Sequence, residues 1–178
     1  MRFFKSDLQG KCDSLTYATL DSAFRMYFDP IVWSDSSQVT GDTIFLTLRD
    51  EMLDSLKVYS NSFILSQNNE GLHNQIKGRR LYGKFKQNDL RKVLVNGNGQ
   101  TIYYPRDEKD GLIGMNRAIC SNIIILLKDN EVSAITFLTK PEAKLYPMSE
   151  AKGEVTRLEG FDPRFTERPT SKKDLLQQ

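Results

Sequence analysis

One short pattern recurs four times along this chain, and it constrains the fold more than any other feature. Each copy begins with an apolar residue, any residue and a small residue, and then runs into a strand-like segment. The copies are "LQGKCDSLTY" (8–17), "VTGDTIFLTL" (39–48), "IKGRRLYGKF" (76–85) and "AICSNIIILL" (118–127), with Gly10, Gly41, Gly78 and Cys120 as the small residues. Self-similarity at this spacing indicates supersecondary units that stack on one another.

The strand-like segments show an apolar and polar alternation with a period of two, as a strand with one buried face requires. Short, regularly spaced strands with almost no 3.6-residue periodicity favour an antiparallel all-β structure over βαβ units. No unit can bury enough apolar surface alone, so we expect an elongated, folded-over sheet of stacked repeats. The residues expected on its inner face are Leu15, Tyr17, Phe24, Met26, Phe28, Ile44, Leu46, Leu48, Leu56, Val58, Leu81, Phe85, Val93, Val95, Ile123, Ile125, Leu127, Ile135 and Phe137.

A bend is predicted once in every unit. The triplets "FDP" (28–30), "SNS" (60–62), "GNG" (97–99) and "TKP" (139–141) follow the second strand of each unit. Gly and Asn tolerate positive φ, and Pro cannot donate to a ladder, so such triplets suit a change of strand direction. A third apolar piece follows each triplet, and the pattern leaves its inward residues undecided. "GNG" is no dinucleotide fingerprint, because "QTIYY" continues it as a strand and not as a helix.

The four units occupy residues 1–147, and a polar tail occupies residues 148–178. The tail has few apolar anchors and contains Pro163 and Pro169. We expect it to wrap the sheet edge or to be partly disordered, with a short helix possible from Ser171.

Bulk composition excludes several classes of function. The net charge of +2 gives no global attraction to nucleic acid, and no apolar run approaches the roughly 20 residues that span a bilayer. No export signal is recognisable at the start of the sequence. Cys12, Cys120 and His73 do not form a zinc pattern, and no catalytic motif occurs. We therefore predict no catalytic residue, no metal, no cofactor, no nucleic-acid partner and no enzymatic activity.

Basic residues gather in the third unit, where Lys77, Arg79, Arg80 and Lys84 alternate with apolar positions. They form either a cationic strip for phosphate groups or a solvated outer face that protects a sheet edge. The apolar interior is likewise open to two interpretations, a closed core or a trough that accepts acyl chains.

Two stretches, 30–43 and 74–104, carry the phrases "PIVWSDSSQVTGDT" and "NQIKG…VLVNGNGQTIYY". They resemble the OstA-like family of the lipopolysaccharide-transport proteins LptA and LptD, most closely the OstA-like proteins of Bacteroidetes. The resemblance covers about residues 10–147. Cys120 departs from it, because the other units have glycine at that position.

The resemblance implies a twisted, open β-jellyroll that binds the acyl chains of lipid A in its trough. It implies a non-enzymatic periplasmic carrier or bridge for lipopolysaccharide on its way to the outer membrane. The inner-face residues become candidate lipid contacts, and Lys77, Arg79, Arg80 and Lys84 become candidate phosphate contacts on the rim. Other β-jellyroll proteins of the same transport system are expected to add end to end, and the chain to form homo-oligomers at high concentration. The alternative is a scaffolding β-repeat with a closed core and protein partners only.

Overall fold

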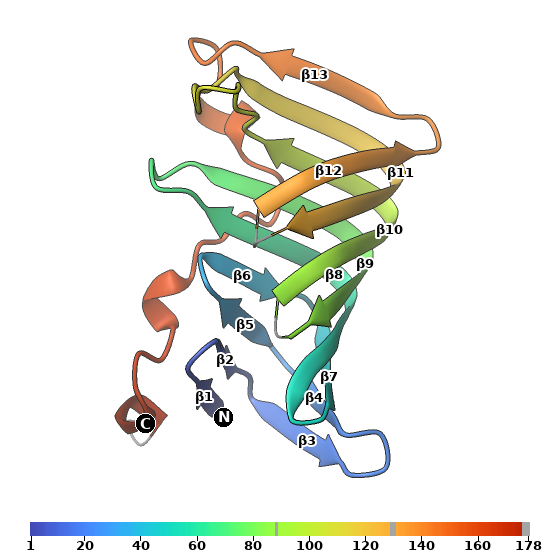
Figure 1. Cartoon of the computed structure of the whole chain (residues 1–178), viewed down its shortest axis with the longest axis vertical. Coiled ribbons are helices and arrows are strands. Elements are labelled where there is room, and N and C mark those ends of the chain that lie inside the picture. Colours follow the sequence, from blue (N-terminus) through green and yellow to red (C-terminus); the bar gives the residue numbers. More distant parts are fainter. Residues whose placement is uncertain (88, 129–130, 176–178) are drawn as a thin grey trace.

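The computed structural model describes residues 1–87, 89–128 and 131–175, and its strands form one antiparallel sheet (Figure 1). Three short 3₁₀ helices follow in the tail. The elements are β1 (Arg2–Lys5), β2 (Leu8–Lys11), β3 (Ser14–Ala18), β4 (Ala23–Tyr27), β5 (Ile31–Ser34), β6 (Ser37–Thr40), β7 (Thr43–Arg49), β8 (Met52–Gln67), β9 (His73–Lys86), β10 (Asp89–Tyr103), β11 (Met115–Lys128), β12 (Glu131–Leu138), β13 (Glu142–Tyr146), η1 (Gly153–Thr156), η2 (Phe165–Glu167) and η3 (Lys172–Leu175).

The sheet is folded over along its length, so that it has two halves that face each other (Figure 1). The apolar cluster between them lines what is called the trough. The β13 half contains β1, β2, β5, β6 and β13, and the β12 half contains β3, β4, β7 and β12. The long strands β8, β9, β10 and β11 bend and belong to both halves. The prediction of an all-β, folded-over antiparallel sheet is confirmed.

The bends lie at the four predicted triplets. The first two residues of each triplet have positive φ: Phe28 and Asp29 (58° and 54°), Ser60 and Asn61 (57° and 50°), Gly97 and Asn98 (82° and 51°), Thr139 and Lys140 (65° and 51°). In β8 and β10 the pairing register shifts at the same place. Two successive left-handed residues therefore carry the chain from one half of the sheet to the other.

A backbone hydrogen bond shows which residues of the units correspond at the bend. The N–H of Asp13 donates to the Phe28 carbonyl, that of Asp42 to Ser60, and that of Ser121 to Thr139. The preceding residues are Cys12, Gly41 and Cys120. In the first unit the residue that corresponds to Gly41 and Cys120 is thus Cys12, and not Gly10 as the sequence alignment of the units predicts. Because the two positions differ by two residues, the strand residues of this unit keep their predicted inward and outward directions.

The first three of the third apolar pieces gave no facing signal because the structure buries both of their faces, whereas the fourth, in β13, is largely exposed. Val32 and Ile64 pack on the trough side, whereas Trp33, Leu65 and Ile102 are fully buried on the opposite side. A strand covered on both faces reads as a continuous apolar run without alternation.

The tail covers that opposite face of the β13 half and does not simply follow an edge. Leu158 is 2% exposed and packs with Phe63, Leu65 and Ile102 in a second apolar cluster. In Figure 1 the tail descends from β13 past β6 toward β1. Within residues 1–87, 89–128 and 131–175 no helix is long and apolar enough to cross a membrane.

Candidate functional site

The inner faces of the two halves form one continuous apolar trough. Of the predicted inner-face residues, Met26, Ile44, Leu46, Leu56, Val58, Leu81, Val93, Val95, Ile123 and Ile125 are buried in its core. Leu15, Phe24, Leu48, Phe85, Leu127, Ile135 and Phe137 are half-buried against that core. The alternation in the sequence therefore located the trough, because no other element of the described residues covers the outer face of the β12 half, which thus contrasts with the inner face.

A cavity of about 260 Å³ opens at the N-terminal end of the trough. Its walls are largely apolar and come from both halves, so that a ligand would lie between them. The lining residues are Phe3, Lys5, Asp7, Leu8, Leu15, Phe24, Ser34, Leu46, Leu48, Glu51 and Leu53. Charged groups occur where the turns of the two halves approach each other, namely Lys5, Asp7 and Glu51. This arrangement suits a ligand with an apolar body and a polar end.

A second, smaller cavity of about 70 Å³ continues the first along the trough. The two share Leu8, Ser34 and Leu53, and the second reaches Leu81, Phe85 and Val93 of the long strands. Beyond it the trough is filled by its own side chains, since Val95 and Ile123 are at most 1% exposed.

Two predicted inner-face residues do not contribute buried surface. Phe28 is 70% exposed, because its left-handed backbone at the bend takes it out of the strand alternation, so its inward assignment is wrong. Tyr17 pairs with Phe24 on the trough side, with ring centroids 4.7 Å apart, yet it is 51% exposed. It lies on β3, which pairs only with β4 and leaves one flank of Tyr17 in solvent.

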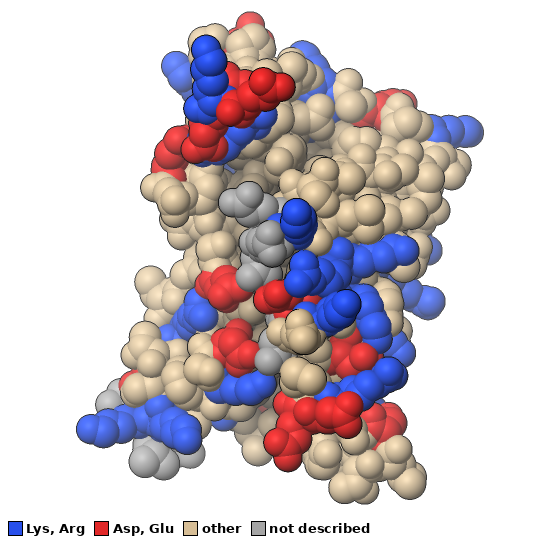
Figure 2. Space-filling view, in the orientation of Figure 1, with Lys and Arg blue, Asp and Glu red and all other residues tan. Residues whose placement is uncertain are grey.

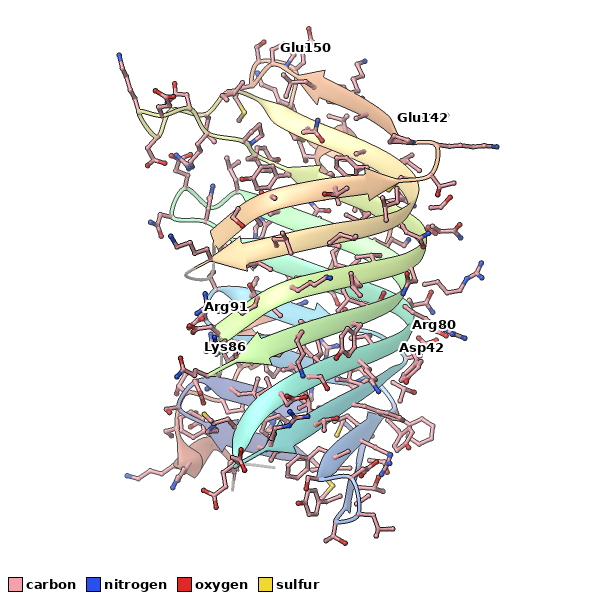
Figure 3. All side chains as sticks on the ribbon, turned by 45° about the vertical axis from the view of Figure 1, so that its right-hand side comes forward. Asp42, Arg80, Lys86, Arg91, Glu142 and Glu150 are labelled. Carbon is pink, nitrogen blue, oxygen red and sulfur yellow. The ribbon has the colours of Figure 1, made fainter. Side chains whose placement is uncertain are left out.

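The four predicted phosphate contacts do not gather on the rim of the trough, and that part of the prediction is wrong. Lys77 lies on the outer face and pairs with Glu159 of the tail at 3.0 Å. Lys84 also faces outward and pairs with Asp54 at 2.7 Å. Figure 3 shows Arg80 at the bend, opposite the side where Lys86 and Arg91 lie. Arg79 precedes it and packs its side chain near Gly97 of the neighbouring bend. Phosphate binding by these residues stays a prediction.

Two further basic residues lie at neighbouring strand tips (Figure 3), although neither lines the two cavities. Lys86 ends β9 and Arg91 lies near the start of β10, with an ion pair from Arg91 to Asp89 at 3.0 Å. Figure 2 shows Lys and Arg side chains gathered over the middle of this face, whereas the part over β11 and β12 carries few charges. In the sequence, Lys86 begins the turn "KQND" and Arg91 follows it two residues later.

Burial shifts the ionisation of the two thiols and the one imidazole of the chain. Burial raises the pKa of the Cys12 and Cys120 thiols, which disfavours the nucleophilic thiolate. Burial also lowers the pKa of His73, whose ring packs against Phe161 and Phe165 of the tail. Among the described residues, no three His, Cys, Asp or Glu side chains are placed to hold a metal ion.

Several trough residues were missed by the sequence analysis. Phe3, Leu8, Leu53 and Leu90 line the two cavities but belong to short strands or strand ends. Such segments hold too few residues for a period of two to be visible.

The folded-over antiparallel sheet and its apolar trough define the class of this structure, an open β-jellyroll of the LptA-like type. Among solved structures, the chain is similar to LptH, described as the LptA-homologous periplasmic component of the lipopolysaccharide transport device of Pseudomonas aeruginosa. The TM-score is 0.61 at 12% sequence identity, over 79% of this chain and 95% of that chain. At this identity the likeness shows a shared fold. No protein-family model and no curated protein sequence matches the chain.

Proposed function

We propose that this chain is a non-enzymatic periplasmic carrier or bridge in lipopolysaccharide transport, and that acyl chains of lipid A lie in its trough. The observation that carries the proposal is the cavity of about 260 Å³ between the halves, lined by Phe3, Leu15, Phe24 and Leu48. Each methylene moved from water into such a lining contributes about 0.8 kcal/mol. The shared fold with a periplasmic transport component supports the same reading.

The polar end of the lipid would meet the charged entrance. Lys5 lies in the cavity lining beside Asp7, and its ammonium group can pair with a phosphate oxygen. Lys86 and Arg91 lie at the neighbouring tips of β9 and β10 (Figure 3) and would extend this contact. Other β-jellyroll domains would add to the sheet ends, where β1, β3, β12 and β13 each have one edge that pairs with no strand of the described residues.

A scaffolding role with a closed core is the second candidate. The observation that favours it is the filled middle of the trough, where Val58, Leu81 and Val95 are at most 2% exposed. The two candidate functions make different demands on the cavity, since only a carrier must leave space there for a ligand.

Filling the cavity separates the two candidates. Leu48→Trp places an indole in the cavity, and Leu126→Trp makes the same change on the outer face of β11, where Leu126 is 44% exposed. Binding of a fluorescent fatty-acyl probe, and its displacement by purified lipopolysaccharide, is measured for both variants. The carrier predicts weakened binding for Leu48→Trp only, whereas equal binding by both variants, or none by the unmodified chain, rejects it.

A further inference from the structure

A row of side chains crosses the outer face of the β13 half at one position of every unit. The strand register runs through this row without interruption. Its members, in order, are Gln9, Trp33, Gln38, Leu65, Gln75, Ile102 and Arg117. Polar and apolar residues alternate along it, and the three glutamines are at most 2% exposed. A buried amide requires hydrogen-bond partners, so these glutamines identify a built polar site.

The tail supplies the partners, chiefly through its backbone. Gln38 Nε2 donates to the Asp162 carbonyl at 2.8 Å, and its Oε1 accepts from the Arg164 N–H at 2.7 Å. Gln75 repeats this pattern with the Thr156 carbonyl and the Leu158 N–H, both at 2.8 Å. Each amide thus bonds a C=O and an N–H two residues apart, as the edge of a neighbouring strand would.

The ends of the row hold the tail as well. Arg117 donates to the Val155 carbonyl at 2.9 Å, and Gln9 accepts from Arg168 Nε at 2.7 Å. The row therefore contacts the tail at all four units. Because most of these bonds reach backbone groups, they select a peptide backbone and place little demand on its side chains.

Two side chains of the tail set its position on the row. Leu158 fills the apolar cluster, and Arg164 makes a bidentate contact with Asp29 at 2.7 and 2.9 Å. Arg164 also pairs with Glu167, which in turn accepts from Lys11 at 2.6 Å. An apolar residue followed six positions later by arginine is thus the pattern that fits the row.

The tail can leave the row without breaking the sheet. Residues 147–175 pair with no strand, and among them Leu158 and Pro169 alone are buried. Undocking would expose Trp33, Leu65 and Ile102, whose side chains are fully buried beneath it. An empty row therefore presents apolar surface and unpaired amides, and it favours a new occupant.

We propose that this row is a docking site for a peptide segment, occupied by the chain's own tail in an isolated molecule and by the tail of a second copy in concentrated protein. The second copy carries the same backbone pattern and the same Leu158 and Arg164 anchors. Residues 147–154 link the sheet to the docked segment and reach at most about 26 to 29 Å when extended, enough to cross to an adjacent molecule. The attached tail competes at an effective concentration in the millimolar range, so exchange requires protein at about 1 mM.

Two variants, each with one added cysteine, test the exchange in the full chain. Lys77 Nζ lies 3.0 Å from Glu159 of the docked tail, whereas the native Cys12 and Cys120 are buried. Lys77→Cys and Glu159→Cys proteins are mixed at about 1 mM and treated with a short bifunctional thiol crosslinker. The matched control replaces Lys77→Cys by Lys57→Cys, an exposed position on the outer face of the β12 half.

We expect the mixture of the Lys77→Cys and Glu159→Cys proteins to give a crosslinked heterodimer in much higher yield than the mixture of the Lys57→Cys and Glu159→Cys proteins. A double variant with Lys77→Cys and Glu159→Cys in one chain tests whether the tail docks on the row at all. At low protein concentration its crosslink should form within the molecule. If that internal crosslink forms but the heterodimer stays at the control yield, the tail does not exchange and the proposal is overturned. If the internal crosslink also fails, the docking of the tail on the row is wrong. The outcome does not depend on what the trough binds.

Discussion

Adding one methyl group at a bend tests how tightly the two halves of the sheet are joined. A Cβ on Gly41 would lie 2.2 Å from Val58 Cγ1 and 3.1 Å from the Ser60 carbonyl oxygen. Val58 is 1% exposed, and its β-branched side chain has little rotameric freedom in a strand. The methyl group of Gly41→Ala therefore displaces a packed core residue or the backbone of the bend.

The expected cost follows from this overlap. Overpacking of a well-packed core typically costs about 1 to 3 kcal/mol. For a chain of this size, each kcal/mol lowers the melting temperature by about 2 to 4 °C. Val58→Ala also destabilises, because it removes buried methyl groups. In the double variant the new methyl group enters the space that Val58 vacates, so the loss should be about 1 to 3 kcal/mol smaller than the sum of the single losses.

Urea unfolding of the four proteins measures these free energies by linear extrapolation. Fluorescence of Trp33, the one tryptophan of the chain, reports the transition. Gly78 and Val95 provide a repeat of the experiment, since a Cβ on Gly78 would also lie 2.2 Å from a valine Cγ1. Cys120→Ala is the control, because that bend already accommodates a side chain. The reasoning would be refuted if, at both glycines, the stability loss of the double variant equalled the sum of the two single losses within about 0.5 kcal/mol.

Two further outcomes are expected. Met26→Ala should lower the free energy of unfolding in urea by about 2 to 5 kcal/mol, because Met26 is fully buried. Phe28→Ala, two residues later, should change it by no more than about 0.5 kcal/mol, because Phe28 is exposed. Equal losses would contradict the assignment of Met26 to the inner face and of Phe28 to solvent. Hydrogen bonds from Arg164 lower the pKa of Glu167 from 4.5 to about 2, so its stabilising contribution is present above about pH 4.5 and is lost as the pH falls through about 2. Acid titration should therefore release the tail and shift the fluorescence emission of Trp33 to longer wavelength. The emission of the Glu167→Gln variant should depend less on pH. Identical titration curves for the two proteins would exclude the Arg164–Glu167 ion pair as the cause.

The sequence predicted the sheet best where only one face is covered. In the β12 half, Ile44, Leu46 and Val58 alternate with residues of a face that no other element covers, and the pattern identified their direction correctly. In the β13 half, Trp33 and Leu65 are buried by the tail while Val32 and Ile64 are buried by the trough, so no alternation could appear.

The docked tail and the mouth of the trough were beyond the reach of sequence patterns for a different reason. Gln38 and Gln75 bond to tail backbone groups more than 80 residues away, and any residue supplies such groups. Lys84 pairs with Asp54 on the outer face, and that partner lies 30 residues away on β8. Long-range contacts of this kind leave no local periodicity to detect.

Photocrosslinking tests the central claim, that acyl chains lie in the trough, most directly. A photoreactive residue replaces Leu48 in the cavity lining or, as a control, Leu126 on the outer face of β11. Each protein is irradiated with purified lipopolysaccharide. We predict a lipid adduct at position 48 and none at position 126. Equal adducts at both positions, or an adduct at position 126 alone, would contradict the trough as the lipid site.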